Sequence, residues 1–234
     1  MTGLVVFSGG QDSTTCLGVA KAECDRVEAI SFFYGQKHFE AEAQAMRYIT
    51  DEFRVPLTLI SLGFLPEITV SALTDHRMSI NAPHPQHPKL PASFVPNRNA
   101  LFLTVAHAFA QKIQAQKIYT GVCQTDYSGY PDCREEFIRS LEATLNMASG
   151  VDIAIVTPLM HLDKAQTFRL AHDLGILSLV LSHSHTCYNG ITTSNPWGNG
   201  CGECPACRIR VRGFLEYQKM QLFSSSVSNG DKPC

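Results

Sequence analysis

The feature that most constrains the fold is a short apolar run that leads directly into a glycine turn. Gly3 to Phe7 reads GLVVF, which is typical of a strand buried on both faces of a parallel sheet. Ser8-Gly9-Gly10 then predicts a tight turn, and the polar residues 12–15 supply N-cap chemistry for a helix to about Lys21. A buried strand joined to a helix in this way indicates an α/β unit.

The same alternation of strand and helix continues along the chain. Apolar runs predict strands, and apolar residues at helical spacing predict helices. The expected strands are 27–33, 57–62, 117–122 and 153–156, and the expected helices are 39–53, 100–114, 132–148, 163–174 and 206 to about 220. This order predicts a doubly wound, Rossmann-like α/β fold with a parallel sheet, in which ligands meet at the carboxyl ends of the strands.

The composition is that of an ordinary globular protein. The chain has 234 residues, of which 44% are hydrophobic and 17% charged, and its formal net charge is -2. This charge argues against a polybasic nucleic-acid binder, and no run of about 18 apolar residues is present that could span a membrane. The N-terminus lacks the basic region of a signal peptide, so we expect a cytoplasmic protein.

The chain is expected to divide into three parts. Residues 1–181 form the α/β domain, residues 182–221 a small metal-binding appendage with a C-terminal helix, and residues 222–234 a flexible tail. Within the first part, residues 81–96 hold five prolines and two histidines, which excludes regular structure. A loop of this length predicts a lid over the site.

The glycine turn also predicts a binding site. Glycines let the backbone approach a ligand closely, and the start of a helix presents unpaired N–H groups with a partial positive charge. Together they form a cradle for an anion. A Walker A loop would end in Gly-Lys-Ser/Thr, but the first lysine is Lys21, and the G-x-G-x-x-G fingerprint of dinucleotide sites is absent.

Four of the nine cysteines predict a metal site. They lie close together in the sequence, as Cys187, Cys201, Cys204 and Cys207. Four thiolates can close a tetrahedron around Zn²⁺, which makes a structural site, and a reducing compartment favours metal ligation over disulfides. An iron–sulfur cluster is the alternative. His183 or His185 could replace Cys187 as a ligand, but a solvated loop is the expected state of these histidines.

Longer motifs connect the chain with known proteins. The string SGGQDS at 8–13 resembles the pyrophosphate loop (PP-loop) of ATP pyrophosphatases. Five more motifs follow in order: FYGQKH at 33–38, FVPNRN at 94–99, GVCQTDYSGYPDCR at 121–134, TPLM at 157–160 and TCYNG at 186–190. The series covers essentially Val5 to Tyr217 and resembles the 7-cyano-7-deazaguanine synthase (QueC) family.

The resemblance implies an adenine nucleotide alpha hydrolase-like fold and an ATP-dependent ligase. In such enzymes ATP, with Mg²⁺, adenylates the carboxylate of 7-carboxy-7-deazaguanine, and ammonia displaces AMP to give an amide. A second ATP activates the amide, and loss of AMP leaves the nitrile 7-cyano-7-deazaguanine, a precursor of queuosine. Family members are homodimers with one structural zinc per subunit, and we expect neither a nucleic acid nor a membrane as partner.

The resemblance also assigns site residues. The residues expected to bind ATP are Phe7, Ser8, Gly9, Gly10, Gln11, Asp12, Ser13, Thr14, Thr15, Cys16 and Leu17. The catalytic candidates are Asp12, Ser13, Arg98 and Lys164. The substrate candidates are Tyr34, Gln36, His38, Arg98, Asn99, Asp126, Tyr127, Tyr130, Asp132 and Arg134.

Physical roles can be attached to several of these candidates. Backbone N–H groups of residues 9–13 neutralise the pyrophosphate, and Asp12 caps the helix or positions Mg²⁺. The cations Arg98, Arg134 and Lys164 offset the repulsion between a carboxylate and a triphosphate, unless they form structural ion pairs. The acids at 126 and 132 would read the N–H donors of the deazaguanine, and a tyrosine at 127 or 130 would stack on its ring or pack in the core.

The chain departs from the family pattern at three places. Asn97 stands where a glycine is expected, which is a mild change because asparagine tolerates left-handed backbone. His161 stands where the family has a tryptophan, so a ring that packs on substrate or partner is smaller here. The segment between Cys187 and Cys201 is longer and carries Trp197, which could touch a partner or the mouth of the site.

Three alternative functions remain open at this point. A paralogue could adenylate the same acid and pass it to an amine of a protein or nucleic acid. A tRNA-modifying enzyme could use Arg208, Arg210 and Arg212, although their spacing around a helix predicts a solvated face. A zinc-stabilised module that binds a nucleotide without cleaving it is the third alternative.

Overall fold

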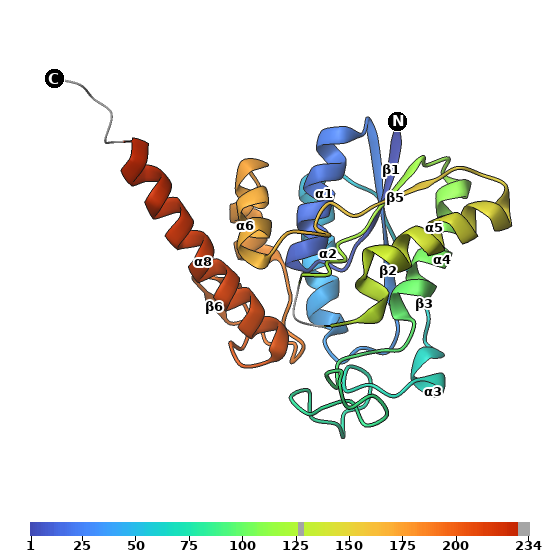
Figure 1. Cartoon of the computed structure of the whole chain (residues 1–234), viewed down its shortest axis with the longest axis horizontal. Helices are drawn as coiled ribbons and strands as arrows, with labels where there is room; N and C mark the ends of the chain where they lie inside the picture. Colours follow the sequence, from blue (N-terminus) through green and yellow to red (C-terminus); the bar gives the residue numbers. More distant parts are fainter. Residues whose placement is uncertain (126–128, 229–234) are drawn as a thin grey trace.

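The sheet of the protein is parallel throughout. The computed structural model describes residues 1–125 and 129–228. Its five-stranded sheet has the order β3-β2-β1-β4-β5 (Figure 1). The strands are β1 (Thr2–Val6), β2 (Arg26–Phe33), β3 (Leu57–Ser61), β4 (Lys117–Tyr119) and β5 (Ala154–Val156). In the register of the central strand, Gly3 lies opposite both Val27 and Lys117.

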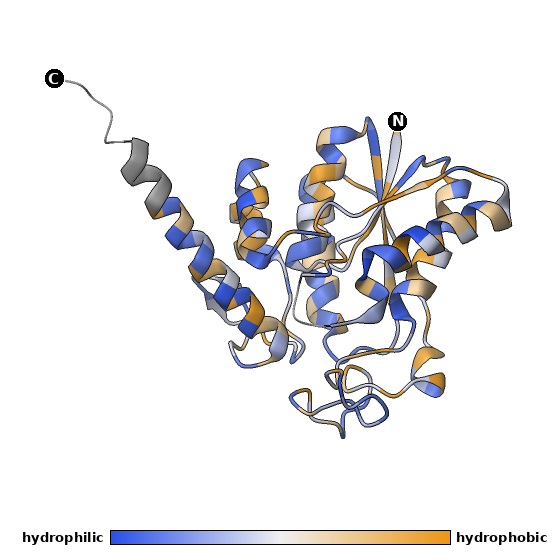
Figure 2. Ribbon diagram, in the orientation of Figure 1, coloured by the Kyte–Doolittle hydropathy of each residue, from blue (hydrophilic) through white to orange (hydrophobic). Residues whose placement is uncertain are grey.

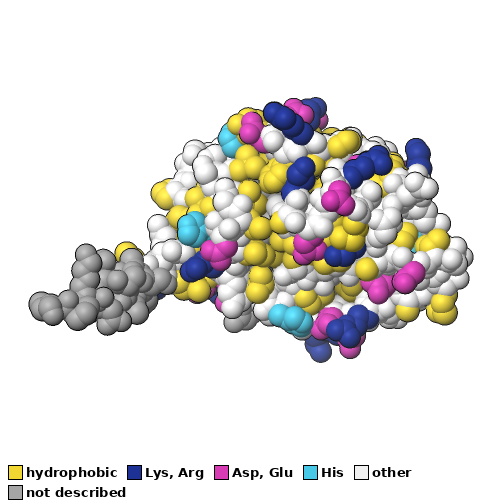
Figure 3. Space-filling model, turned by 90° about the horizontal axis from the view of Figure 1, so that it is seen from above, with side chains coloured by type: hydrophobic (Ala, Val, Ile, Leu, Met, Phe, Trp, Pro, Cys, Tyr) yellow, Lys and Arg dark blue, Asp and Glu magenta, His cyan; other side chains and the backbone are white. Residues whose placement is uncertain are grey.

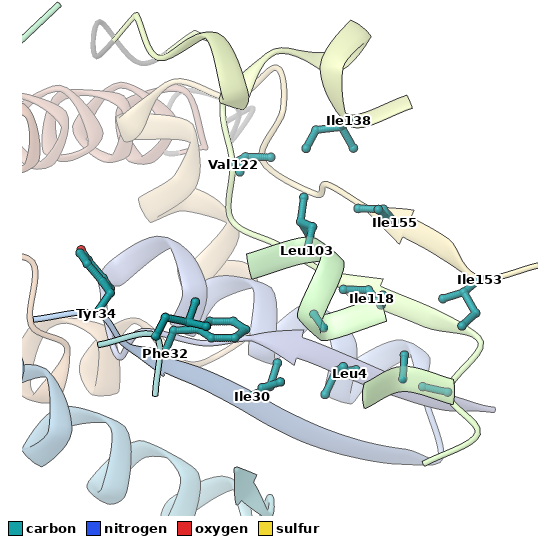
Figure 4. Close-up of a cluster of buried hydrophobic side chains, with 14 of the residues drawn as sticks. Leu4, Ile30, Phe32, Tyr34, Leu103, Ile118, Val122, Ile138, Ile153 and Ile155 are labelled. Carbon is teal, nitrogen blue, oxygen red and sulfur yellow. The ribbon is translucent and has the colours of Figure 1, made fainter. Parts of the chain in front are cut away.

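Helices cover both faces of this sheet. One face packs against α1 (Gln11–Glu23) and α2 (Phe39–Phe53), and the other against α4 (Arg98–Lys112) and α5 (Glu135–Ser149). Successive strand residues point to opposite faces. Leu4, Ile30 and Ile118 therefore join the core under α4 (Figure 4), whereas their neighbours Val5, Ala29 and Tyr119 join the core under α1 and α2. The doubly wound α/β fold predicted from the sequence is confirmed.

The C-terminal part adds helices beside this sheet. They are α6 (Lys164–Asp173), α7 (Leu177–His183) and the long α8 (Pro205–Ser228), whose far end projects from the body (Figure 1). Figure 2 shows polar and apolar residues mixed along α8. Phe168 of α6, Val180 of α7 and Phe214 of α8 are buried together in one cluster.

Several elements differ from the sequence expectation. Helix α7 is unexpected because its apolar residues lie in a Ser- and His-rich stretch, and they are ordered by packing against α6. The short β6 (Ser194–Asn195) and β7 (Gly198–Asn199) form an unexpected hairpin. Further short elements are α3 (Leu65–Ile68) and a 3₁₀ turn at Pro131–Cys133. Helix α8 continues to Ser228 through part of the expected tail, because an established helix gains one hydrogen bond per added residue.

The proline-rich segment 81–96 is irregular, as predicted, and it is compact. His84 is fully buried at its centre, where its Nε2 atom lies 2.7 Å from the Val70 carbonyl oxygen. The Nδ1 atom of the same ring accepts the backbone N–H groups of Gln86 and His87. The segment ends at the site, because the Ser93 hydroxyl lies 2.6 Å from that of Tyr130.

The surface of the described chain carries mixed charge. On the face shown in Figure 3, Lys and Arg side chains are interspersed with Asp and Glu. Of the helices in the described parts of the chain, none is both long enough and apolar enough to cross a bilayer.

Helix α4 begins at a strained position. Asn97 precedes it with φ 57° and ψ 18°, in the left-handed region. Glycine adopts this conformation without cost, and asparagine is among the few other residues that tolerate it. The sequence expectation for Asn97 is therefore confirmed.

We expect a graded response to substitution of Asn97. Asn97→Gly should keep the free energy of unfolding, whereas Asn97→Ala should lower it by about 1–2 kcal/mol through left-handed strain. Both variants lack the side-chain amide of Asn97. The difference between their free energies of unfolding therefore isolates the effect of the backbone conformation. Urea unfolding would measure it, and equal stabilities of the two variants would contradict the explanation.

Candidate active site

The candidate site is a cleft at the carboxyl ends of β1 and β4. The chain leaves these neighbouring strands toward opposite faces of the sheet, so a crevice opens between them. The PP-loop residues 8–13 form one wall. The other walls come from the ends of β2 and β4, the start of α4, the first turns of α8, and His185, Thr186 and Tyr188.

The PP-loop is shaped by close packing. Gly9 has φ 73°, and a Cβ atom there would lie 3.0 Å from the backbone nitrogen of Met46. The hydroxyl groups of Ser13 and Thr14 donate to the Gly10 carbonyl oxygen, at 3.1 and 2.8 Å. The N-cap of α1 is Gly10, and no side chain caps this helix, contrary to the capping predicted for residues 12–15. Apart from the N–H of Gln11, which donates to the Thr186 hydroxyl, the N–H groups of the first helical turn therefore remain for a ligand.

The side chain of Asp12 pairs with a distant lysine. Lys164 Nζ lies 2.9 and 2.8 Å from the two carboxylate oxygens of Asp12. Lys164 is the first residue of α6, which begins with a capping box between Asp163 and Gln166. A Cβ atom on Gly213 of α8 would lie 2.4 Å from the Cβ atom of Lys164, so this glycine permits the close approach of α8. The structure thus brings together two of the predicted catalytic residues.

Arg98 lies partly buried in an aromatic part of the cleft. Its Nη1 atom donates to the Tyr34 hydroxyl at 3.4 Å, and its guanidinium carbon lies 5.9 Å from the ring centres of Tyr34 and Tyr130. Burial raises the pKa of Tyr34 to about 12, so this phenol is neutral. Within the described chain Arg98 forms no ion pair with a carboxylate, and its Nε atom has no hydrogen-bond partner. A partly buried cation whose Nε atom is buried without a partner favours an anionic ligand.

Glu42 is a cleft residue that the sequence analysis missed. Its two carboxylate oxygens lie 3.0 Å from Gln36 Nε2 and 3.4 Å from His38 Nε2. Gln36 in turn accepts the backbone N–H of Tyr34. Glu42 stands among alternating Glu and Ala residues at the start of α2, a pattern typical of a solvated helix end, so the sequence carried no signal for it.

The remaining substrate candidates are divided between the cleft and its surroundings. Asn99 lines the cleft, and its backbone N–H donates to Asp132 Oδ2 at 3.0 Å, so this acid supports the start of α4. Arg134 does not line the cleft; it is exposed and lies 3.6 Å from Glu136. Asp126 and Tyr127 lie outside the described residues.

His161 also lies outside the cleft, with its ring largely exposed and 3.3 Å from Glu135. The His161 ring therefore lies at the surface beside the Glu135 carboxylate.

The four clustered cysteines form a site that could hold a metal. The sulfur atoms of Cys187, Cys201, Cys204 and Cys207 all lie within 4.8 Å of one another. In a tetrahedral site with metal–sulfur bonds of about 2.3 Å, sulfur atoms are about 3.8 Å apart, so this set fits. The backbone N–H of Cys204 donates to the Cys201 sulfur at 3.3 Å, an orientation that suits a thiolate. A Cβ atom on Gly200 would lie 2.7 Å from the Cys207 sulfur, so glycine is needed there.

The two nearby histidines are not part of this cluster. His183 stacks on Tyr48 with ring centres 3.6 Å apart. His185 is buried, not solvated as predicted, because its backbone N–H donates to the Gly9 carbonyl oxygen at 2.8 Å. Its Nε2 atom lies 2.9 Å from the Cys187 carbonyl oxygen.

The prediction of a solvated arginine face on α8 is wrong for one of its three members. Arg208 and Arg212 are exposed, but Arg210 is only 1% exposed. Its guanidinium donates to the carbonyl oxygens of Trp197 and Val180, both at 2.9 Å, and lines the cleft. The spacing of the three arginines along the helix could not show that Arg210 is buried. The hairpin that covers it comes from the long segment before Cys201.

Comparison with known proteins decides the family. The family model described as "Queuosine biosynthesis protein QueC" matches residues 2–218. The chain belongs to this family. It is 52% identical to the 7-cyano-7-deazaguanine synthase of Wolinella succinogenes over 92% of this chain and 93% of that protein. It is 48% identical to the synthase of Staphylococcus epidermidis over 92% of each chain.

Solved structures share less with this QueC family member. A predicted tRNA methyltransferase subunit from Methanocaldococcus jannaschii matches with a TM-score of 0.47 and 20% identity, over 75% of this chain and 74% of that one. The NH3-dependent NAD synthetase of Campylobacter jejuni matches with a TM-score of 0.44 and 12% identity, over 76% and 67%.

A substitution at Gly198 should test the packing of Arg210. Gly198 has φ 115°, and a Cβ atom there would lie 2.1 Å from Arg210 Nη2. Gly198→Ala must displace a buried, hydrogen-bonded cation, so we expect the free energy of unfolding to fall by about 2–4 kcal/mol.

Gly150→Ala is the matched control for this substitution. Gly150 also has a positive φ of 67°, but nothing lies within 4 Å of its Cβ position. The free energy of unfolding of Gly150→Ala should therefore fall only by the conformational cost, about 1–2 kcal/mol. Equal losses at the two glycines in urea unfolding would show that Arg210 does not fill the space beside Gly198.

Proposed function

We propose that this chain is a 7-cyano-7-deazaguanine synthase, which makes its product from 7-carboxy-7-deazaguanine, ammonia and ATP. One observation carries the proposal. A PP-loop and a partly buried arginine that lacks a carboxylate partner in the described chain line the same cleft, in a chain 52% identical to a synthase of this name. The first element suits a triphosphate and the second a carboxylate.

The cleft residues suit the first step, in which the substrate carboxylate attacks the α-phosphorus of ATP and pyrophosphate leaves. The N–H groups at the start of α1 and the hydroxyl of Ser13 stabilise the charge of the leaving group. Lys164 and Arg98 lower the repulsion between the two anions and hold them in line. Mg²⁺, when bound, supplies further charge neutralisation at the triphosphate, and the carboxylate of Asp12 beside the loop fits it as a ligand.

The later steps reuse the same groups. Ammonia attacks the acyl-adenylate, AMP leaves, and a proton is released as the amide forms. The amide oxygen then attacks a second ATP, and loss of AMP and a proton gives the nitrile. Each step that forms an adenylate releases one pyrophosphate, so the PP-loop acts twice in a cycle.

We further propose that the aromatic part of the cleft holds the deazaguanine ring. Tyr34, Phe102 and Tyr130 offer ring faces there, which supports stacking. Glu42 lines the cleft and forms no ion pair with a described lysine or arginine. Its carboxylate suits the N–H donors of the base, a role for which Asp132 is less available because it supports α4.

The cysteine cluster is proposed to hold one structural zinc ion per chain. All four ligand positions are filled by sulfur, so no position remains open for substrate. Thiolate ligands need a reducing environment, which supports a cytoplasmic location.

We also propose that the enzyme is a homodimer. The resemblance implies it, and exposed apolar side chains at the sheet edge, Leu59, Phe64 and Ile68, support it. Light scattering should give twice the mass of the 25.8 kDa chain. The monomer mass at micromolar concentration would contradict it.

One reaction mixture tests the proposed activity. Purified protein is mixed with ATP, Mg²⁺, ammonium and 7-carboxy-7-deazaguanine, and all products are identified by mass. We expect the nitrile, with two AMP and two pyrophosphate for each nitrile. AMP without amide or nitrile would reject ammonia as acceptor and favour transfer to another amine, and no consumption of ATP would reject the proposal.

Replacing Asp12 should stop this reaction. Asp12→Ala removes the carboxylate that pairs with Lys164 Nζ at 2.8 Å in the cleft, so we expect turnover to fall by at least about 100-fold while the thermal midpoint is retained. Asp173→Ala is the control, since it removes an exposed ion pair with Arg169 outside the cleft. Normal turnover of Asp12→Ala would remove this residue from the mechanism.

Replacing Cys204 should release the metal. Cys204→Ser removes one buried sulfur ligand, so we expect less than about one tenth of a zinc ion per chain, together with low solubility. Cys24→Ser, which changes a cysteine outside the cluster, should keep one zinc ion. Elemental analysis measures both, and a stable, zinc-free, active Cys204→Ser protein would show that the cluster is dispensable.

A further inference from the structure

Residues 184–187, which lead into the cysteine cluster, lie directly against the PP-loop. The backbone N–H of His185 donates to the Gly9 carbonyl oxygen at 2.8 Å. The backbone N–H of Gln11, the first residue of α1, donates to the hydroxyl oxygen of Thr186 at 3.4 Å. A Cβ atom on Gly10 would lie 3.4 Å from the His185 carbonyl oxygen. Residues 185 and 186 therefore form a wall of the cleft that faces the PP-loop.

The hydroxyl group of Thr186 is held from behind by the buried arginine. Arg210 Nη1 donates to it at 3.0 Å. Burial lowers the pKa of Arg210 to about 10, so the group remains charged at neutral pH. Arg210 forms no ion pair with any carboxylate in the described residues, and its remaining contacts are with carbonyl oxygens.

This arrangement fixes the direction in which Thr186 can donate. A hydroxyl oxygen accepts two hydrogen bonds and donates one. Gln11 and Arg210 both donate to the Thr186 oxygen, so the two acceptor positions are filled and the proton remains for a third group. Among the described residues no such acceptor is present, and Thr186 lines the cleft beside Gly10 and Asp12.

The neighbouring side chain also points to a ligand. Gln11 is 2% exposed and lines the same part of the cleft, yet neither its Nε2 nor its Oε1 atom has a hydrogen-bond partner in the described chain. A buried amide without partners costs free energy, and a bound polar ligand would remove that cost.

We propose that Thr186 is a pyrophosphate-binding residue, which donates its hydroxyl proton to a phosphate oxygen, and that Arg210 positions and polarises it. The proposal rests on the proposed function only in that ATP is cleaved to pyrophosphate. It adds a second wall, from the cysteine-cluster end of the chain, to the phosphate site. Thr186 touches the ligand, whereas Arg210 acts through Thr186.

The proposal is tested by measuring how tightly the zinc-loaded protein binds pyrophosphate in the presence of Mg²⁺. Calorimetry gives this affinity directly. Thr186→Val keeps the shape of the side chain and removes the hydroxyl, so we expect pyrophosphate to bind about 10- to 100-fold more weakly. Thr186→Ser restores the hydroxyl and should bind within about threefold of the native protein. Affinity of Thr186→Val within about twofold of the native value would overturn the proposal.

Two controls separate binding from structure. Thr192→Val changes an exposed threonine that lies between Cys187 and Cys201 and does not line the cleft, so pyrophosphate affinity should be unchanged. The zinc content and thermal midpoint of Thr186→Val should equal those of the native protein. A loss of affinity accompanied by loss of zinc, and not restored in Thr186→Ser, would overturn the proposal in favour of a structural role.

The role of Arg210 is tested by coupling. Arg210→Gln should weaken pyrophosphate binding, and adding Thr186→Val to it should have little further effect, because both changes remove one interaction. If the loss of pyrophosphate affinity in the double variant equals the product of the two single losses, the positioning role of Arg210 is overturned. If Arg210→Gln does not fold, the serine and valine variants at 186 still decide the binding role.

Steady-state kinetics separates this inference from the proposed function. Thr186→Val should raise the KM for ATP and leave the KM for 7-carboxy-7-deazaguanine unchanged. A native protein that binds pyrophosphate through Thr186 but makes no nitrile would refute the proposed reaction and support the phosphate site.

Discussion

The pairing of β1 with a parallel strand on each side is the constraint on which the rest of the structure depends. It directs the chain to one face of the sheet after β1 and to the other face after β4, and the crevice between them becomes the site. Gly121, just after β4, packs against the PP-loop. A Cβ atom on this glycine would lie 3.2 Å from the backbone of Asp12 and Ser13. The position of the PP-loop is thus set by the central strands, before any ligand contributes.

Two arginines, Arg210 fully buried and Arg98 partly buried, give the cleft its electrostatic character. Arg98 and Arg210 form no ion pair with a carboxylate in the described chain, and each is held by neutral oxygen atoms. Removing a charge from water without a counter-ion is costly, fully for Arg210 and in part for Arg98, and the fold must supply the stability that keeps both in place. Their positive charge is matched when anionic ligands enter. The near-neutral net charge of the chain does not reveal this local excess.

The sequence predicted local features well and long-range ones poorly. The parallel sheet, the PP-loop and the four cysteines are visible as short patterns whose chemistry is contained within a few residues. Glu42 and Arg210 carry no such pattern, and the TCYNG motif does not show what Thr186 faces, because each of the three enters the cleft through packing between segments far apart in the chain. Arg210 is the clearest case, since its burial depends on a hairpin that composition alone describes as a polar loop. The role expected for Asp132 likewise depended on where α4 begins, which only the three-dimensional structure shows.

The cleft is completed from the end of the chain. The PP-loop is made before the opposite wall, because Lys164, Thr186 and Arg210 lie more than 150 residues later in the sequence and are held in place by α6 and α8. On a ribosome, the growing polypeptide therefore exposes its glycine loop long before the opposite wall has been synthesised. A nascent chain has no complete cleft in which to cleave ATP, so the order of synthesis itself delays ATP cleavage until α8 has been made.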